Sequence, residues 1–397
     1  MNEYKVRDLL TIKNGKDHKH LGDGKYPVYG SGGIMRYVDS YLYDKPSILL
    51  PRKGTLDNIQ YCDTPFWCVD TTYYSEVNTS LANPYYLYRY LSILNLKGLD
   101  SGTALPSMTF DSYYQIKVSL PNIEMQNRIG NALYQIDQKI ALNTRMNAEL
   151  EAMAKQLYDY WFVQFDFPDE NGNPYKSSGG KMVYNSTLKR EIPECFQISN
   201  LRLLNIYNSD YTANGSFAGL AENVKYNEGE KYALLIRVVD FNDNFSNQDK
   251  FVYINKHGYD YLNSCHLEGG EIIICNVGNA GATYRCPPLK IKMALGPNGV
   301  VVNHNLWNNY LYMYYSSDMG QQQIKSISSG SIQLKFNKTS FREMPLLVPK
   351  LNILEAFNSQ YDTIETKKTK LWLENRELTS LRDSLLPMLM NGQVTVE

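Results

Sequence analysis

An internal repeat constrains the fold of this 397-residue chain more than any other feature of its sequence. Residues 102–121 align with residues 330–349, and both segments span 20 residues. Their first Gly, a central aromatic residue (Tyr113 and Phe341) and the closing Pro recur at a constant offset of 228. Further matches follow in the same order, which chance explains poorly. The sequence therefore predicts two diverged copies of one structural unit.

The repeat extends on both sides of this segment. Downstream, four residues of the first copy are identical to the residues 228 positions later. These residues are Asn147, Glu149, Leu150 and Leu157, and their counterparts are Asn375, Glu377, Leu378 and Leu385. Upstream, residues 86–88 match residues 310–312 at an offset of 224, whereas Val6 and Leu9 match Ile198 and Leu201 at 192. The offset grows from 192 to 224, so the second copy holds about 32 extra residues, between roughly residues 212 and 270.

Each copy ends in a segment whose seam positions alternate steps of four and three, the spacing of a coiled coil. The first seam runs from Ile129 to Trp161, and the second runs from Phe357 to Leu389. Pro121 and Pro349 fit just before the helix starts. The first helix, from about residue 122 to 162, would be roughly 60 Å long at 1.5 Å per residue. An amphipathic helix of that length needs a partner, and its repeat copy is the natural one.

Polar residues interrupt both seams. Asn147 and Asn375 occupy matching positions, and a buried polar seam residue typically fixes helix register at some cost in stability. Lys368 and Arg382 also fall on the second seam, where they are expected to weaken its packing.

The globular parts are predicted to mix helices and strands. The apolar runs at residues 47–50 and 271–274 favour strands, and residues 84–94 favour a helix. Residues 165–193 are dense in Pro, Gly, Asn and Ser, which indicates a linker between the copies.

Composition narrows the class of protein. Hydrophobic residues make up 43% and charged residues 20%, and the net charge is −1, so nucleic-acid binding would need locally concentrated positive charge. The six cysteines form no CxxC pair, which argues against a zinc ribbon. Neither a signal peptide nor a membrane-length apolar run of about 18 residues is visible, and a cytoplasmic location is expected. The 33 tyrosines suit both interfaces and cores.

Three motifs suggest chemistry, and each has a simpler structural interpretation. Residues 83–86, Asn-Pro-Tyr-Tyr, resemble the catalytic loop of adenine-N6 methyltransferases, but Asn as N-cap and Pro at the first helical position explain them better. Residues 278–281, Gly-Asn-Ala-Gly, lack the complete phosphate-loop patterns and favour a tight turn. His18 and His20 form an isolated pair without evident further metal ligands. No catalytic or metal-binding residue is therefore assigned.

Basic and polar clusters in both copies are candidates for DNA contacts. Such side chains neutralise phosphates or reach base edges, although any single one is more often a solvated surface residue. The candidates are Lys13, Lys16, His18, Lys19, His20, Arg52 and Lys53 in the first copy, and Arg237, Arg285, Lys290, Lys292 and Lys335 in the second.

These patterns together resemble the specificity subunits of type I restriction–modification systems. The resemblance rests on Gly102-Thr103, Leu120-Pro121, Gln126 and Ile129, which match the family's junction between recognition domain and helix. Residues 24–34 are similar to a common opening of the recognition domain, and residues 161–183 are similar to the central connector. The likeness covers nearly the whole chain, but Leu354 replaces the helix-opening Gln in the second copy.

The resemblance implies an α+β fold, in which a mixed α/β target-recognition domain and a long helix are duplicated and the two helices pair as an antiparallel coiled coil. The expected parts are target-recognition domain 1 (1–121), a first spacer helix (122–163), a linker (164–193), target-recognition domain 2 (194–349), a second spacer helix (350–390) and a tail (391–397). Each domain would read one half of an interrupted site in double-stranded DNA.

The same resemblance implies partners that carry the chemistry. Two methyltransferase subunits would bind AdoMet and modify adenine, and separate restriction or translocase subunits would use ATP and Mg²⁺. This chain would then hold no cofactor and catalyse nothing. Two alternatives stay open, a scaffold with degenerate recognition domains and a part of a fused restriction–methylation enzyme.

Overall fold

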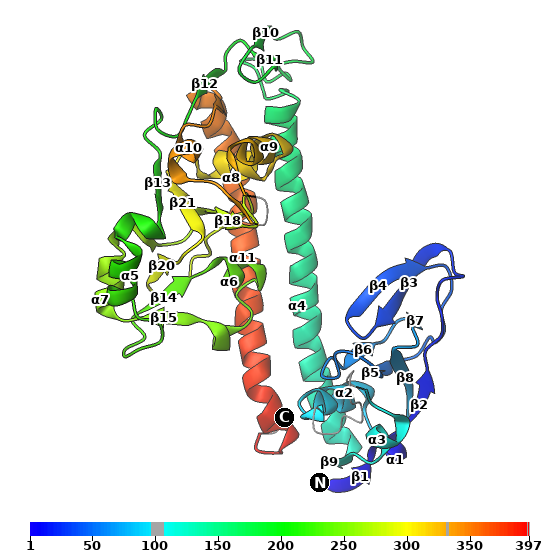
Figure 1. The fold of residues 1–397 in the computed structure, drawn as a ribbon. Helices are drawn as coiled ribbons and strands as arrows, with labels where there is room; N and C mark the ends of the chain where they lie inside the picture. Colours follow the sequence, from blue (N-terminus) through cyan, green and yellow to red (C-terminus); the bar gives the residue numbers. More distant parts are fainter. Residues whose placement is uncertain (97–106, 331–332, 395, 397) are drawn as a thin grey trace. The chain divides into compact units, whose positions relative to one another are not determined.

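The computed structural model describes residues 1–96, 107–330, 333–394 and 396, and many of its elements are labelled in Figure 1. The chain divides into two compact units. Unit 1 comprises Met1–Thr144 and Glu374–Glu397, and unit 2 comprises Arg145–Leu373. Each unit therefore contains a globular part and a segment of both long helices, α4 (Ile123–Tyr158) and α11 (Leu351–Met390). Within the described residues, no helix has the length and apolar character needed to cross a membrane.

The globular part of unit 1 is built on an antiparallel sheet of order β2-β8-β5-β6. Its strands are β2 (Leu10–Asn14), β8 (Thr72–Val77), β5 (Ser47–Pro51) and β6 (Gln60–Cys62). A second sheet has the order β4-β3-β7, with β4 (Gly33–Val38), β3 (Asp23–Gly30) and β7 (Trp67–Cys68). The ends of this part are joined by pairing of β1 (Asn2–Lys5) with β9 (Lys117–Leu120). Its helices are α1 (Val6–Leu9), α2 (Pro84–Ser92) and α3 (Phe110–Tyr114).

Unit 2 repeats this arrangement with other strands. Its main antiparallel sheet has the order β13-β21-β17-β19, formed by β13 (Tyr207–Asp210), β21 (Gly299–Asn303), β17 (Ile272–Cys275) and β19 (Thr283–Arg285). A second sheet, of order β15-β14-β20-β16, consists of β15 (Val252–Ile254), β14 (Ala233–Ile236), β20 (Met293–Leu295) and β16 (His266–Leu267). The closing pair is β12 (Gln197–Ser199) with β23 (Leu346–Val348). Three helices follow the main sheet, α8 (Asn308–Ser316), α9 (Asp318–Ile327) and α10 (Lys338–Arg342).

The two strand orders confirm the duplication that the sequence repeat predicted. Strand β3 pairs with β7 in parallel and with β4 antiparallel, and β14 pairs with β20 in parallel and with β15 antiparallel. The extra residues of the second copy fold into short helices and turns, some of which pack around a small core of their own. These elements are η3 (Tyr211–Asn214), α5 (Phe217–Asn223), α6 (Val238–Asn242), η4 (Gln248–Lys250), α7 (Lys256–Tyr261) and η5 (Asn263–Cys265).

Helix caps in the structure explain two sequence signals. The Asn83 side chain accepts a hydrogen bond from the Tyr86 N–H at 2.9 Å, and Pro84 opens α2, which confirms the structural interpretation of the Asn-Pro-Tyr-Tyr motif. Thr109 and Asn337 cap α3 and α10, and they are separated by the repeat offset of 228. The Gly278 and Gly281 φ angles of +89° and +99° fit the tight turn expected at that motif.

The long helices pair antiparallel in each unit, and polar contacts join them. In unit 1, the Asn375 side chain donates to the Ile140 carbonyl at 3.2 Å and to the Thr144 hydroxyl at 3.1 Å. The Oδ1 atom of Asn147, its repeat counterpart in unit 2, is buried and has no hydrogen-bond partner among the described residues. The structure thus shows a helix-to-helix contact for Asn375, whereas a register role for Asn147 stays a prediction.

Two seam residues differ from expectation. Lys368 and Arg382 were expected to weaken the packing, yet each pairs with an acidic residue on α4, Glu151 and Asp137 respectively. The two acids lie two heptads apart, and so do their basic partners. The sequence repeat alone did not indicate these pairs because it aligns the helices with each other rather than placing them face to face.

The segment expected to be a linker is folded onto unit 2. It begins after the π-helical turn η2 (Asp159–Val163) and contains a hairpin of β10 (Met182–Asn185) and β11 (Arg190–Pro193). Phe165 and Phe167 are buried, and the Phe167 ring stacks on Phe196 with centroids 5.1 Å apart. The Gly, Asn and Pro residues therefore form turns, while the aromatic residues between them are buried in the core of unit 2.

Many tyrosine side chains are buried in the hydrophobic cores. Six tyrosines are among the largest fully buried side chains, namely Tyr86, Tyr113, Tyr310, Tyr314, Tyr315 and Tyr361. Others stay exposed, such as Tyr184 and Tyr37. Tyrosine can be buried because its hydroxyl can still donate a hydrogen bond to a backbone carbonyl, as the Tyr113 hydroxyl does to the Pro51 carbonyl at 2.7 Å.

Buried tyrosines should make the fold sensitive to alkali. Burial raises the pKa of Tyr314 to about 12, above its ordinary value of 10.0. Above pH 10 the unfolded chain loses phenolic protons that the folded chain keeps, so stability should fall as the pH rises from about 10 to 12. Absorbance at 295 nm should show part of the 33 tyrosines ionising only with unfolding. Reversible ionisation of all of them near pH 10 in the folded chain would contradict the burial.

Candidate nucleic-acid interface

The main sheet of unit 1 gathers basic residues at one edge. Strands β2 and β5 both run antiparallel to β8, so their carboxyl ends meet at the same edge of the sheet. Lys16 follows β2, and Arg52 and Lys53 follow β5. The Lys16 N–H donates to the Cys68 carbonyl at 2.8 Å, and the Arg52 N–H donates to the Thr71 carbonyl at 2.9 Å. We call Lys16, Arg52 and Lys53 the basic edge.

The side chains of the basic edge are available to solvent. Lys16 and Lys53 are exposed, and Arg52 is half-buried. The Arg52 guanidinium donates to the Asp70 carbonyl at 3.3 Å and lies 5.9 Å from the centre of the Tyr73 ring. An arginine anchored on one side, together with two exposed lysines, is suited to a phosphate backbone, because phosphates accept both bidentate and point-charge contacts.

The other first-copy candidates divide into two groups. The loop with His18, Lys19 and His20 adjoins the basic edge, since the Trp67 indole donates to the Lys16 carbonyl at 3.0 Å and its ring meets that of His20 at 5.9 Å. Lys13 instead faces Glu76 on the neighbouring strand at 3.7 Å. Among the described residues, no group of three or more His, Cys, Asp or Glu could hold a metal ion.

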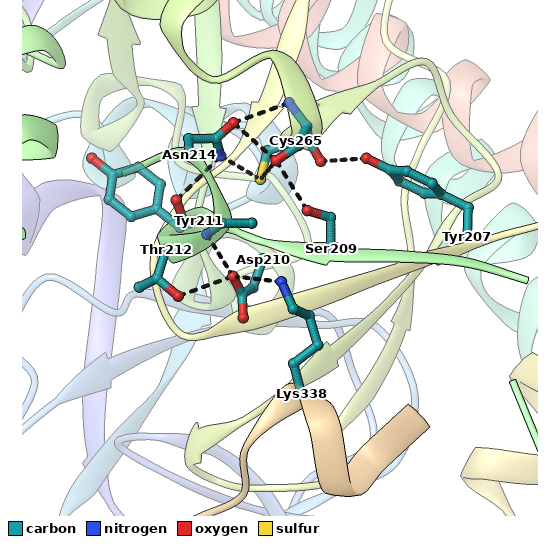
Figure 2. A network of polar contacts seen from close by, with 10 residues as sticks. Tyr207, Ser209, Asp210, Tyr211, Thr212, Asn214, Cys265 and Lys338 are labelled. Atoms are coloured by element: carbon teal, nitrogen blue, oxygen red, sulfur yellow. Dashed lines mark hydrogen bonds and ion pairs between the residues drawn. The ribbon is translucent and has the colours of Figure 1, made fainter. Parts of the chain in front are cut away.

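The equivalent edge of unit 2 carries a carboxylate (Figure 2). Strands β13 and β17 run antiparallel to β21, so Asp210 lies where β13 ends at the corresponding edge. Its Oδ1 atom accepts from the Thr212 hydroxyl at 2.9 Å, the Ala213 N–H at 2.8 Å and the Lys338 ammonium at 3.3 Å. Asn14 occupies the same register position in unit 1, so the two edges differ in charge.

A second part of this network ties β13 to the inserted turns (Figure 2). Asn214 Oδ1 accepts from the Ser264 N–H at 3.0 Å, and the Asn214 amide donates to the Cys265 sulfur at 3.2 Å. The Tyr207 hydroxyl donates to the Ser264 carbonyl at 2.7 Å. Burial raises the pKa of the Cys265 thiol, which disfavours the nucleophilic thiolate. The network therefore holds the turns in place and offers no activated nucleophile.

Equivalent short bridges in the two units each present one lysine. In unit 1, Lys53 bridges to Ser107. In unit 2, β18 (Val277–Gly278) pairs with β22 (Leu334–Lys335), and Lys335 lies opposite Val277. Ser107 and Lys335 are separated by the repeat offset of 228, so the two bridges are equivalent. The lysine lies on the first strand of the bridge in unit 1 and on the second strand in unit 2. Sequence alignment of the copies could not reveal this correspondence, because the lysines themselves do not align.

The other second-copy candidates lie on different elements. The Arg237 guanidinium binds Asp240 at 2.7 Å, and this hydrogen bond raises the pKa of the arginine. Arg285 is 14% exposed, and its Nη1 atom donates to Asn309 at 2.9 Å. Lys292 donates to the Tyr232 hydroxyl at 2.5 Å, whereas Lys290 is exposed. Both arginines thus bind side chains inside unit 2, although Arg285 Nε and Nη2 have no hydrogen-bond partner among the described residues. The surface candidates there are Lys290, Lys292 and Lys335.

Comparison with known proteins identifies related chains. Residues 1–152 match the family model of the type I restriction modification DNA specificity domain. The chain is 21% identical over 341 residues to the specificity subunit of type I restriction enzyme HindI from Haemophilus influenzae, covering 74% of this chain and 72% of that protein. It is 22% identical over 315 residues to the MjaIX specificity subunit from Methanocaldococcus jannaschii, covering 79% and 69%.

A solved structure shares the fold. The crystal structure of the S subunit of a type I restriction-modification system from M. genitalium matches with a TM-score of 0.65 at 15% identity, covering 98% of this chain and 95% of that one. The sequence matches, the duplicated domain and the paired long helices agree with one another. By these matches the chain is similar to the specificity subunits of type I restriction–modification systems, and its residues 1–152 match their DNA specificity domain.

Proposed function

We propose that this chain is the DNA-reading subunit of a type I restriction–modification complex, and that each globular part contacts one half of a two-part target. The observation that carries this proposal is the duplicated sheet whose equivalent edges differ in charge. The edge of unit 1 presents Lys16, Arg52 and Lys53, whereas the edge of unit 2 presents Asp210 and Lys338. One module in two chemical versions suits an asymmetric sequence, because direct readout depends on which donors and acceptors meet the base edges.

The chemistry of the complex is assigned to partner subunits. Two methyltransferase subunits would bind AdoMet and modify adenine, and restriction or translocase subunits would use ATP and Mg²⁺. The role of residues 83–86 as a helix cap supports a non-catalytic chain, since this methyltransferase-like motif has a structural use. Met153 on α4 and Tyr160 on the following turn η2 are exposed apolar side chains, and they would belong to the surface on which the methyltransferases dock.

Salt dependence tests the DNA contact at the basic edge. Replacing Lys16 and Lys53 together with alanine should weaken the methyltransferase complex on specific and random duplexes alike, because phosphate contacts are independent of sequence. The slope of log affinity against log salt should shrink by about two if both lysines neutralise phosphates. Fluorescence anisotropy at several salt concentrations measures it.

A control separates a local contact from a general loss of charge. Lys117→Ala removes an exposed lysine from β9, away from the ends of β2 and β5, and should leave the slope unchanged. An unchanged slope in the double variant as well would assign Lys16 and Lys53 to a solvated face. Salt-independent binding by the unaltered complex would instead favour a scaffold without DNA contacts.

A further inference from the structure

One carboxylate in unit 1 joins three elements. Asp137 lies on α4 with 18% of its side chain exposed. It accepts hydrogen bonds from the Tyr85 hydroxyl and the Arg89 guanidinium, both on α2 of the globular part. Its other oxygen accepts from Arg382 Nη1 on α11 at 2.7 Å. A single side chain therefore connects the globular part with both long helices.

The arginine at this junction is held by aromatic rings. The Arg89 side chain is 12% exposed, and its guanidinium lies 4.9 Å from the centre of the Tyr88 ring and 5.6 Å from that of Tyr85. Stacking on a ring and pairing with a carboxylate fix both the position and the plane of a guanidinium. The junction is therefore directional rather than merely attractive.

Unit 2 has a corresponding junction at Glu365. This residue follows Asp137 by the repeat offset of 228 and so occupies the same place on α11. Its Oε1 atom lies 3.8 Å from Arg285 Nε, and its Oε2 atom lies 3.4 Å from the Lys368 ammonium. The Arg285 guanidinium lies 4.9 Å from the centre of the Tyr312 ring, and Tyr312 is the repeat counterpart of Tyr88.

The arginines of the two junctions are not repeat counterparts. Arg89 belongs to α2, and its counterpart at the local offset of 224 is Met313. Arg285 instead comes from β19. The two copies therefore share the acid and the tyrosine but supply the arginine from different elements. The same arrangement of acid, arginine and tyrosine is therefore built in the two copies from arginines on different elements.

The junction of unit 2 also reaches both helices. Lys368 on α11 binds Glu365 on its own helix and Glu151 on α4. These carboxylates outweigh the effect of burial and raise the pKa of Lys368, which keeps it charged. Asn309 on α8, which binds Arg285, also donates to Asp362 on α11 at 2.7 Å.

Stability alone does not explain such junctions. Removing two charges from water costs free energy that their attraction often fails to recover, and apolar replacements of similar volume can be equally stable. Buried ion pairs can instead supply a defined conformation. Arg89 and Arg285 each keep at least one guanidinium nitrogen without a hydrogen-bond partner among the described residues, so the tyrosine rings and the carboxylates define where these guanidinium groups lie. Both junctions lie where a globular part meets the helix pair of its own unit, so the geometry they define is that of the globular part on the helices.

We propose that Asp137 and Glu365 are positioning residues that fix the orientation of each globular part on the long helices, and hence hold its DNA-reading edge in place. The proposal rests on the DNA-reading function proposed above. It predicts that weakening a junction loosens the discrimination between targets with correct and incorrect spacing, while general DNA affinity persists.

The test uses the full chain in complex with its methyltransferase. Asp137→Asn and Glu365→Gln remove the charge with little change in shape. Duplexes would carry both half-sites, as mapped by methylation, with the native spacer or a spacer one base pair longer or shorter. The ratio of affinities for native and altered spacers should fall on the order of tenfold, comparable to the effect of one mismatched base pair. Binding to random duplex and its salt slope should not change.

Matched variants distinguish positioning from stability. Glu124→Gln removes an exposed carboxylate that pairs with Arg128 on the same helix, and it should leave spacer discrimination unchanged. Asp137→Glu keeps the charge and should restore part of the discrimination. If Asp137→Asn does not fold, Arg89→Lys keeps the charge, loses the planar stack, and should show the same loosening.

Two results would overturn the inference or its basis, and they are distinguishable. A lower melting temperature with unchanged spacer discrimination in the Asn and Gln variants would make these residues purely structural. If the unaltered complex itself does not discriminate between spacers, the proposed two-part reading fails instead, whatever the variants do.

Discussion

Replacing Phe357 with alanine is expected to lower the free energy of unfolding of unit 2 by about 3–5 kcal/mol, the usual cost of truncating a buried aromatic residue. Phe357 is fully buried on α11. Its ring lies 5.0 Å from that of Phe162 and 5.9 Å from that of Trp161 on the connecting helical turn. The cavity would therefore open where both helices and the globular part share one core.

Denaturant unfolding measures this effect. Trp161 and Trp307 belong to the core of unit 2, so their fluorescence reports its unfolding. Met153→Ala truncates a side chain that is 55% exposed in the same unit, and it should change the stability by less than about 0.5 kcal/mol. A loss below about 1 kcal/mol in Phe357→Ala would show that the core is not packed as described.

Exchanging residues 1–121 for the matching block of another specificity subunit is expected to change one half of the recognised sequence and to spare the other half. Affinity for the original target should fall on the order of a thousandfold or more, toward that of random DNA. The strands support the choice of ends, because Asn2 pairs with Leu120 and the block begins and ends on one small sheet. Methylation mapping of the hybrid complex measures the change.

The reciprocal exchange is the matched control. Residues 197–348 are closed in the same way, since Gln197 pairs with Val348. Exchanging that block should alter only the other half of the sequence. Simultaneous change of both halves by either exchange would show that the two globular parts do not read DNA independently.

The features that could be predicted from sequence are those set by local pattern. The long helices followed from the steps of four and three, and the cap at Asn83 followed from the residues next to it. The duplication followed from a constant offset, and the matching strand orders confirm it. Such features need no knowledge of what lies opposite in space.

The features that could not be predicted depend on tertiary contacts. Lys368 and Arg382 looked unfavourable on an apolar seam until their acidic partners on the other helix were known. Arg285 looked like a phosphate ligand, but it lies between tyrosine rings inside unit 2. The convergence of Lys16 with Arg52 required the strand order, because 36 positions separate them in sequence.

The most direct test of a two-part reading is to express the unaltered chain with its methyltransferase and to map modified adenines across a genome. We expect one motif made of two defined, different half-sites separated by a spacer of fixed length and variable sequence. A single uninterrupted motif, two identical half-sites, or methylation without a common motif would contradict it.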